Sequence, residues 1–247
     1  MKYINIKGKK IGQGAPKICV SLIGKTKEEI LEQAISINNQ LVDIVEWRAD
    51  WFSYVDNKEC VLDVLGHLQA ILKNIPILFT FRSKKEGGEK EISLEDYKDL
   101  NLHVAQSKLV DMIDIEVFMD KEIQQVIRKL KDIDSIIIGS YHNFYETPKK
   151  EEIMKRLLFM EKCGVDIGKI AVMPKEKEDV IELLDSTIEG NKNLHIPIIT
   201  MSMGELGVIS RISGKLTGSA ITFGSLKKAS APGQIEVEKL KEIIETL

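Results

Sequence analysis

The stretch "GKIAVMPKEKEDVIELLDSTIEG" (residues 168–190) contains one complete strand-and-helix unit, and it sets the pattern for the rest of the chain. Its first seven residues are apolar or small except for Lys169, which is typical of a buried strand. Residues 177–190 then carry apolar side chains at helical spacing. We expect these to form one stripe on a helix, made of Val180, Ile181, Leu183, Leu184 and Ile188.

The same alternation runs along the whole sequence. Amphipathic segments such as 26–41 separate the strand candidates, and two residue pairs typical of helix starts support this interpretation, Thr26 with Glu29 and Ser93 with Asp96. With residues 168–174, the chain has eight strand candidates, the other seven being 17–22, 42–50, 75–82, 110–118, 134–142, 196–203 and 219–225. Strands that alternate with helices predict a parallel α/β fold.

Eight is also the number of strands that closes a (β/α)₈ barrel, a fold of about 250 residues. An open doubly wound sheet could hold as many strands, but the first strand lacks the G-x-G-x-x-G turn of the dinucleotide-binding form. We therefore expect one α/β domain over residues 1–247, a single (β/α)₈ TIM barrel. Residues 1–15 predict an N-terminal β-hairpin that turns at Gly8-Lys9 and closes the bottom of the barrel.

The composition excludes several classes of protein. A net charge of −3 gives no electrostatic reason to expect nucleic acid as a partner. No apolar run approaches the roughly 18 residues of a membrane span, and the N-terminus lacks the apolar segment of a signal peptide. Cys19, Cys60 and Cys163 form no disulfide framework, so we expect a reducing cytoplasm. No histidine pair has metal-ligand spacing, so we expect no metal.

Arginine use points to a functional site. The chain has five arginines against 30 lysines, and three of them, Arg48, Arg82 and Arg211, lie at or just after strand ends. Active sites of (β/α)₈ barrels lie at those ends, and arginine is suited to binding a carboxylate or phosphate. An alternative remains for each arginine: a structural ion pair with one of the glutamates Glu46, Glu86 or Glu116.

Lys169 and His142 are the candidate catalytic residues. Lys169 shares a strand face with Ala171 and Met173, where burial and nearby arginines disfavour the ammonium form and produce an amine able to form a Schiff base. His142 alone among the four histidines ends a strand, where active sites of this fold lie, so it is the candidate general acid or base; a hydrogen-bonded structural histidine is the alternative. Two alternatives stay open for Lys169: its side chain reaches solvent, or it pairs with Asp114 or Glu116. The roles of these two acids are unassigned.

Three motifs at strand ends resemble type I 3-dehydroquinate dehydratases: "EWRAD" (46–50), "TFRSKKEGG" (80–88) and "SYHNF" (140–144). The resemblance extends to the final loop "ASAPGQ" (229–234) and so covers nearly the whole chain. It implies a (β/α)₈ barrel, a homodimer without cofactor or metal, that converts 3-dehydroquinate to 3-dehydroshikimate.

The resemblance also implies residue roles at the matching positions. Lys169 would form an iminium with the C3 ketone, His142 would move protons between C2 and the C1 hydroxyl, and Glu86 would hydrogen-bond His142. Arg211 would bind the substrate carboxylate, while Glu46 and Arg82 would bind ring hydroxyls. The resemblance adds the remaining pocket residues Arg48, Met203, Phe223, Ser230 and Gln234.

Two other functions stay open at this point. A class I Schiff-base aldolase would hold a phosphate near the last two strand ends, where Gly204, Gly207, Gly224 and Ser225 lie. A non-catalytic, carboxylate-binding barrel would use Lys169 only as a positive charge. The segment 224–234 is longer than the two to six residues usual for such connections, and it predicts an active-site lid.

Overall fold

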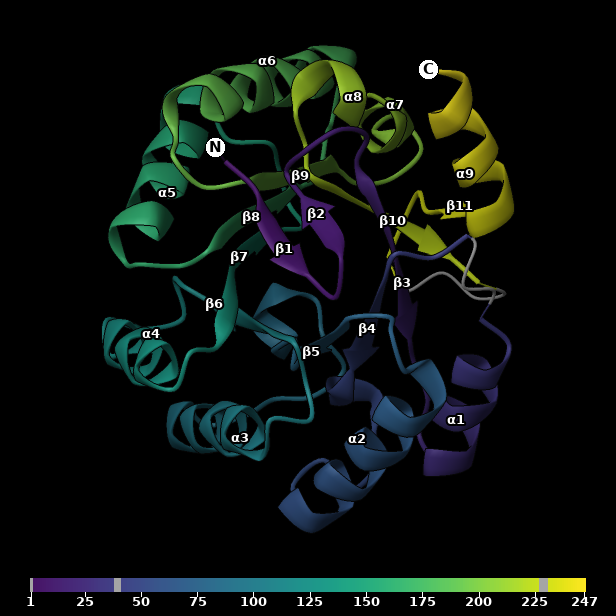
Figure 1. The fold of residues 1–247 in the computed structure, drawn as a ribbon. Coiled ribbons are helices and arrows are strands. Elements are labelled where there is room, and N and C mark those ends of the chain that lie inside the picture. The colour runs from purple at the N-terminus through teal and green to yellow at the C-terminus, as the bar shows by residue number, and fades with distance from the viewer. Residues whose placement is uncertain (1, 38–40, 227–230) are drawn as a thin grey trace.

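A computed structural model describes residues 2–37, 41–226 and 231–247. Eight parallel strands form a ring in chain order (Figure 1), and the ring closes where Ala220 N donates to Ile198 O at 2.8 Å. The strands are β3 (Lys17–Leu22), β4 (Ile44–Arg48), β5 (Ile77–Thr80), β6 (Met112–Glu116), β7 (Ile136–Asn143), β8 (Ile167–Val172), β9 (Ile198–Ser202) and β10 (Ile221–Ser225). The predicted (β/α)₈ barrel is confirmed.

Helices surround the ring on its outside (Figure 1). They are α1 (Lys27–Ile35), α2 (Lys58–Leu72), α3 (Leu94–Ser107), α4 (Ile123–Asp132), α5 (Lys150–Lys162), α6 (Lys177–Asn193), α7 (Val208–Ile212), α8 (Gly214–Thr217) and α9 (Val237–Thr246). Thr26 caps α1 and Ser93 caps α3, so both predicted helix starts are confirmed. Among the described residues, no helix has both the length and the apolar content needed to cross a membrane.

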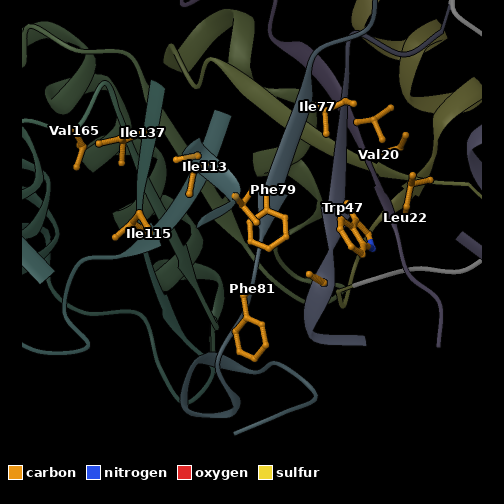
Figure 2. Packing of buried hydrophobic residues seen from close by; sticks show 14 of the residues in the cluster. Val20, Leu22, Trp47, Ile77, Phe79, Phe81, Ile113, Ile115, Ile137 and Val165 are labelled. Carbon is orange, nitrogen blue, oxygen red and sulfur yellow. The ribbon is translucent and has the colours of Figure 1, made fainter. Parts of the chain in front are cut away.

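Alternation along each strand divides the barrel into two cores. On β3, Val20 and Leu22 pack outward against the helices, whereas Cys19 belongs to the cluster inside the barrel. Figure 2 shows the outward-facing side chains, with Trp47 and Phe79 in an edge-on contact of 5.7 Å between ring centroids. The inward positions of the same strands are therefore the ones available to build a site.

The N-terminal hairpin closes one end of this barrel. It consists of β1 (Ile4–Ile6) and β2 (Lys9–Ile11), which lie across the ring in Figure 1. Ile6 and Ile11 are buried in the inner cluster. The turn is formed by Lys7 and Gly8, with φ of 47° and 82°, so the predicted turn at Gly8-Lys9 was one residue off. A two-residue turn of this kind needs positive φ at both positions, and glycine suits the second.

Helix α6 presents a different face from the one expected. Ile181 and Ile188 are 64% and 47% exposed, so their assignment to the buried stripe was wrong. Val180 and Leu183 of that stripe are buried as expected, and the buried face continues through Gly190. A Cβ on Gly190 would lie 3.0 Å from Ile198 Cδ1, so this small residue lets the helix approach the sheet closely.

Candidate active site

A pocket of about 160 Å³ opens at the C-terminal ends of the barrel strands. One water needs roughly 10–15 Å³ of such space, so there is room for a small organic molecule. Ten of the eleven residues expected at the site line this pocket: Glu46, Arg48, Arg82, Glu86, His142, Lys169, Met203, Arg211, Phe223 and Gln234. The eleventh, Ser230, lies outside the described residues.

Strand register brings the polar residues together. Ser140 on β7 is the register partner of Glu116 on β6 and of Lys169 on β8, so three adjacent strands place these residues side by side. Two residues further along, His142 pairs with Ala171. Since alternate residues share a face, His142 follows Ser140 on the inner side of β7, nearer the mouth of the barrel.

Lys169 is 4% exposed, and its side chain points into the barrel as expected. Its Nζ lies 3.2 Å from Asp114 Oδ2 and 3.8 Å from Glu46 Oε1. The same nitrogen lies 4.7 Å from the centroid of the Phe223 ring. Carboxylates therefore lie within ion-pair distance of Nζ, whereas the sequence analysis expected nearby arginines to disfavour its ammonium form. The pair with Asp114, one of the alternatives, is present, and the solvent-reaching lysine is wrong.

Arg82 is held by buried carboxylates. Its guanidinium donates to Glu116 Oε1 at 2.9 Å, to Asp114 Oδ1 at 2.8 Å and to Ser140 Oγ at 3.0 Å. Burial lowers the pKa of Arg82, but the charges of Asp114 and Glu116 outweigh it and raise the pKa well above its usual value. Arg82 therefore makes the structural ion pair with Glu116 that the sequence left open as an alternative.

Arg48 has a different partner from those expected. Its Nε and Nη2 each donate to one oxygen of Asp50 at 2.8 Å, a bidentate pair. Asp50 is fully buried and also accepts from the backbone N–H groups of Arg82 and Glu89. Asp50 thus ties the end of β4 to both ends of the segment that carries Glu86.

Arg211, on α7, is the arginine of the pocket that has no carboxylate within ion-pair distance in the described parts of the chain. Its Nη2 donates to Pro232 O at 2.8 Å and its Nη1 to Phe223 O at 3.5 Å, while its buried Nε lacks a partner among the described residues. Burial lowers its pKa from 12.5 to about 10. A buried cation of this kind is suited to binding an anionic ligand.

His142 and Glu86 form a hydrogen-bonded pair. Glu86 Oε2 accepts from the backbone N–H of His142 at 3.0 Å and lies 2.8 Å from its Nδ1. We infer that Nδ1 carries the ring proton, because that oxygen already acts as an acceptor, and Nε2 is then the basic nitrogen.

The surroundings keep the His142 ring neutral. Burial, followed by the positive charges of Arg82, Lys169 and Arg48, lowers the pKa of His142 well below its ordinary value of 6.5. Burial also raises the pKa of Glu86 well above its usual range, with a further contribution from the charge of Glu116. The imidazole is thus able to accept a proton at neutral pH.

The final loop contributes its described end to the pocket. Pro232 O accepts from Arg211 and from Gly204 N, and a Cβ on Gly233 would lie 2.3 Å from Gly204 O. A two-residue strand, β11 (Ile235–Glu236), then pairs with β10, and the sequence analysis made no prediction for it. The predicted lid includes residues 227–230, which lie outside the described residues.

Three acids of this site received no role in the sequence analysis: Asp50, Asp114 and Glu116. The signal for two of them was present, because Asp114 and Glu116 alternate with the apolar Ile113 and Ile115 and so fall on the inner face of β6. In the described residues no group of three or more histidine, cysteine, aspartate or glutamate side chains is arranged to hold a metal ion.

Comparisons with known proteins agree with this geometry. Residues 18–247 match the family model described as type I 3-dehydroquinase. The chain is 48% identical over 246 residues to the 3-dehydroquinate dehydratase of Clostridium novyi (strain NT), covering 99% of this chain and 97% of that protein.

Solved structures are similar over the same length. A type I 3-dehydroquinate dehydratase from Clostridium difficile with covalent modified comenic acid is 46% identical, with a TM-score of 0.96 and coverage of 100% of this chain and 98% of that one. The 3-dehydroquinate dehydratase from Geobacillus kaustophilus HTA426 is 37% identical, with a TM-score of 0.96 and coverage of 100% and 96%. The chain therefore belongs to the type I 3-dehydroquinase family.

Proposed function

We propose that this enzyme dehydrates 3-dehydroquinate through an iminium on Lys169, with His142 as the general acid and base. Family membership makes the chain a hydro-lyase acting on 3-dehydroquinate. The observation that carries the mechanism is the position of Lys169, His142 and Arg211 on the wall of one pocket. An amine, a neutral imidazole and a cation that has no anionic partner among the described residues are the groups that this reaction needs.

The chemistry follows from these groups. Lys169 passes one proton to His142 Nε2, and its neutral Nζ attacks the C3 carbonyl carbon. The carbonyl oxygen takes that proton and one more from the nitrogen and leaves as water, so the nitrogen keeps one proton and a positive charge. The iminium withdraws electrons from the C2–H bond, so that proton becomes acidic. His142 Nε2 removes it and then protonates the C1 hydroxyl, which leaves as water. Such positioned proton transfer typically contributes about 10²–10⁴-fold. Water finally hydrolyses the iminium and releases 3-dehydroshikimate.

The remaining residues hold the substrate and the base. Arg211 binds the substrate carboxylate, since the other two arginines of the pocket are paired with carboxylates. Glu86 orients the His142 ring. Ring hydroxyls meet Glu46 and Arg82. Further contacts come from Arg48, Met203, Phe223, Ser230 and Gln234. The proposal needs neither a metal nor a cofactor.

Family membership favours this reaction over the two alternatives drawn from the sequence, an aldolase of a phosphorylated substrate and a non-catalytic carboxylate-binding barrel. The test is incubation with 3-dehydroquinate while the enone absorbance of 3-dehydroshikimate is followed. Borohydride should then inactivate the protein only when substrate or product is present. No rise in absorbance would contradict the dehydration, and inactivation that is independent of ligand would contradict the iminium.

The resemblance noted in the sequence also supports a homodimer. The alternation of eight strands with helices along the chain supports a single domain. Cys19, Cys60 and Cys163 are free thiols, which fits a reducing compartment, the cytoplasm. Sedimentation at roughly twice the chain mass of 27.9 kDa is the expected result for the dimer. A species at the single chain mass would contradict the homodimer.

A further inference from the structure

Asp114 contacts Lys169 from inside the barrel. It lies in the middle of β6, is fully buried, and is not one of the residues that line the pocket. Its two oxygens serve different partners. Oδ1 accepts from Arg82 at 2.8 Å and from Ser140 Oγ at 2.6 Å, whereas Oδ2 accepts from Lys169 Nζ at 3.2 Å. One oxygen is therefore fixed by the barrel and the other is left for the lysine.

Neither neighbour explains this arrangement by itself. Arg82 has a second buried carboxylate, Glu116, at 2.9 Å, so its charge is balanced without the oxygen that faces Lys169. Glu46 is farther from the lysine, at 3.8 Å, and its own oxygens accept from Ser21 and Thr80. Asp114 is thus the nearest carboxylate to Lys169, and two donors on its other oxygen fix its orientation.

We propose that Asp114 is a positioning residue for the Schiff-base lysine: Oδ2 holds the ammonium of Lys169 and then accepts from the single N–H of the iminium. This inference rests on the proposed iminium. An ammonium with three hydrogens and a ketone give an iminium with one hydrogen and one water, and the nitrogen carries a charge of +1 before and after. An acceptor at a fixed position can therefore bind the nitrogen as an ammonium and as an iminium without moving.

The consequence concerns the geometry of proton removal. The N–H of an iminium lies in the plane of the C=N bond, so an acceptor at a fixed position sets the orientation of that plane. The C2–H bond reacts fastest when it is perpendicular to this plane, where its electrons enter the π system. Asp114 thus turns C2–H toward His142. Burial raises the pKa of Asp114, but Arg82 and Lys169 outweigh it and lower the pKa, so the group is ionised.

The test is Asp114→Asn, which keeps the shape of the side chain. The two donors on Oδ1 require an acceptor, so the amide oxygen takes that side and the NH₂ group faces Lys169. An acceptor is then replaced by a donor at the lysine. We expect kcat to fall by about 10²-fold, the effect of a misplacement of about 1 Å. KM stays close to that of the unsubstituted protein, because Arg211 still holds the substrate.

The matched control is Asp111→Asn, three residues earlier on the chain. Asp111 Oδ2 also accepts from a lysine, Lys7 at 2.8 Å, and from Ile77 N at 2.8 Å, but at the opposite end of the barrel. This variant should keep kcat and KM. A loss of kcat in both variants would show that general weakening of the barrel causes the effect, and would overturn the proposal.

Other outcomes separate this inference from the proposed function. If the unsubstituted protein forms no borohydride adduct on Lys169, the iminium itself is wrong. If the adduct forms and folded Asp114→Asn keeps its kcat, or raises only KM, the role of Asp114 is wrong. Should circular dichroism show that Asp114→Asn is unfolded, Asp114→Glu tests the proposal, because it keeps the charge and displaces the oxygens. A lower kcat with unchanged KM supports the proposal, and an unchanged kcat overturns it.

Discussion

At the N-terminal end of the barrel, three aspartates each pair with one lysine. Asp43, Asp111 and Asp166 lie 2.7–2.9 Å from their lysine partners, and their side chains are 19–23% exposed. Each also accepts from the backbone N–H at the start of the neighbouring strand. These pairs fix the register of strands, and each is a local, partly hydrated contact.

At the C-terminal end, carboxylates and cations are buried, and each carboxylate accepts from more than one side chain. Asp114 is fully buried and accepts hydrogen bonds from Arg82, Ser140 and Lys169. Glu116 accepts from Arg82 and Ser83. Exposed pairs contribute little because water competes for both partners. Removing one member of a buried pair leaves an uncompensated charge and costs much more. The partly exposed pairs at the N-terminal end therefore join strands, whereas the buried contacts at the C-terminal end control the protonation and the orientation of a reactive side chain.

The largest expected effect is that of Lys169→Met, which removes the nucleophile at the buried end. We expect turnover to fall by roughly 10⁴–10⁶-fold, the scale seen when a group of a concerted catalytic set is removed. The control is Lys9→Met, which removes the pair with Asp43 at the exposed end and should keep full activity. Steady-state assay of the enone product measures both. Residual turnover in Lys169→Met close to that of the unsubstituted protein would exclude the Schiff base.

His142→Ala should lower kcat by about 10²–10⁴-fold, because the general base is lost while the amine remains. The variant should still give some borohydride adduct, since imine formation and proton removal are separate steps. His195→Ala is the control, as the His195 side chain is 90% exposed. A near-normal kcat in His142→Ala would contradict the assignment of the base.

Arg211→Ala should raise KM by roughly 10- to 100-fold, which corresponds to losing a hydrogen bond to a charged group. The control is Arg128→Ala, at an exposed position of α4. Steady-state KM for 3-dehydroquinate distinguishes the two variants. If KM does not change in Arg211→Ala, Arg82 or Arg48 binds the carboxylate instead.

The pH dependence of kcat/KM reports the free enzyme's base. Burial and the neighbouring cations lower the pKa of His142, so its neutral form persists to lower pH than in a free histidine. Activity should therefore decline only below the ordinary histidine value of about 6.5. A pH profile that falls from a midpoint at or above that value would contradict the environment described for His142.

The smallest expected effect is that of Asp43→Asn at the exposed end. The amide oxygen can still accept from Ile18 N, so only the partly exposed ion pair with Lys9 is lost. The free energy of unfolding should fall by no more than about 1 kcal/mol, with kcat unchanged. Urea denaturation followed by tryptophan fluorescence measures the first quantity. A large loss of activity would contradict the assignment of structural pairs to the N-terminal end and catalytic contacts to the C-terminal end.

The sequence predicted the strands and the site residues because both follow local rules. The strand expected at 17–22 coincides with β3, and strand-end residues such as Glu46 and Lys169 line the pocket. Alternation along a strand fixes which side chains point inward, and parallel strands bring their C-terminal ends to one place. Neither inference requires knowing which residues far apart in the sequence contact each other.

The partners of those residues could not be predicted in the same way. Lys169 meets Asp114, 55 residues away, only because β7 pairs with both β6 and β8 and brings their inner faces together. Arg48 pairs with Asp50 because the short helix η1 (Ala49–Trp51) turns the chain back after β4. On α6, the spacing of apolar residues was misleading, since Gly190 rather than Ile188 packs against the sheet.

Locating the borohydride adduct on the chain tests the iminium mechanism most sharply. The protein is reduced in the presence of 3-dehydroquinate, digested, and its lysine-containing peptides are compared by mass spectrometry. The iminium mechanism predicts one modified residue, Lys169, and no modification of Lys7 or Lys9, which pair with aspartates at the opposite end of the barrel. An adduct on a different lysine, or none despite turnover, would show that buried Lys169 is not the reactive amine.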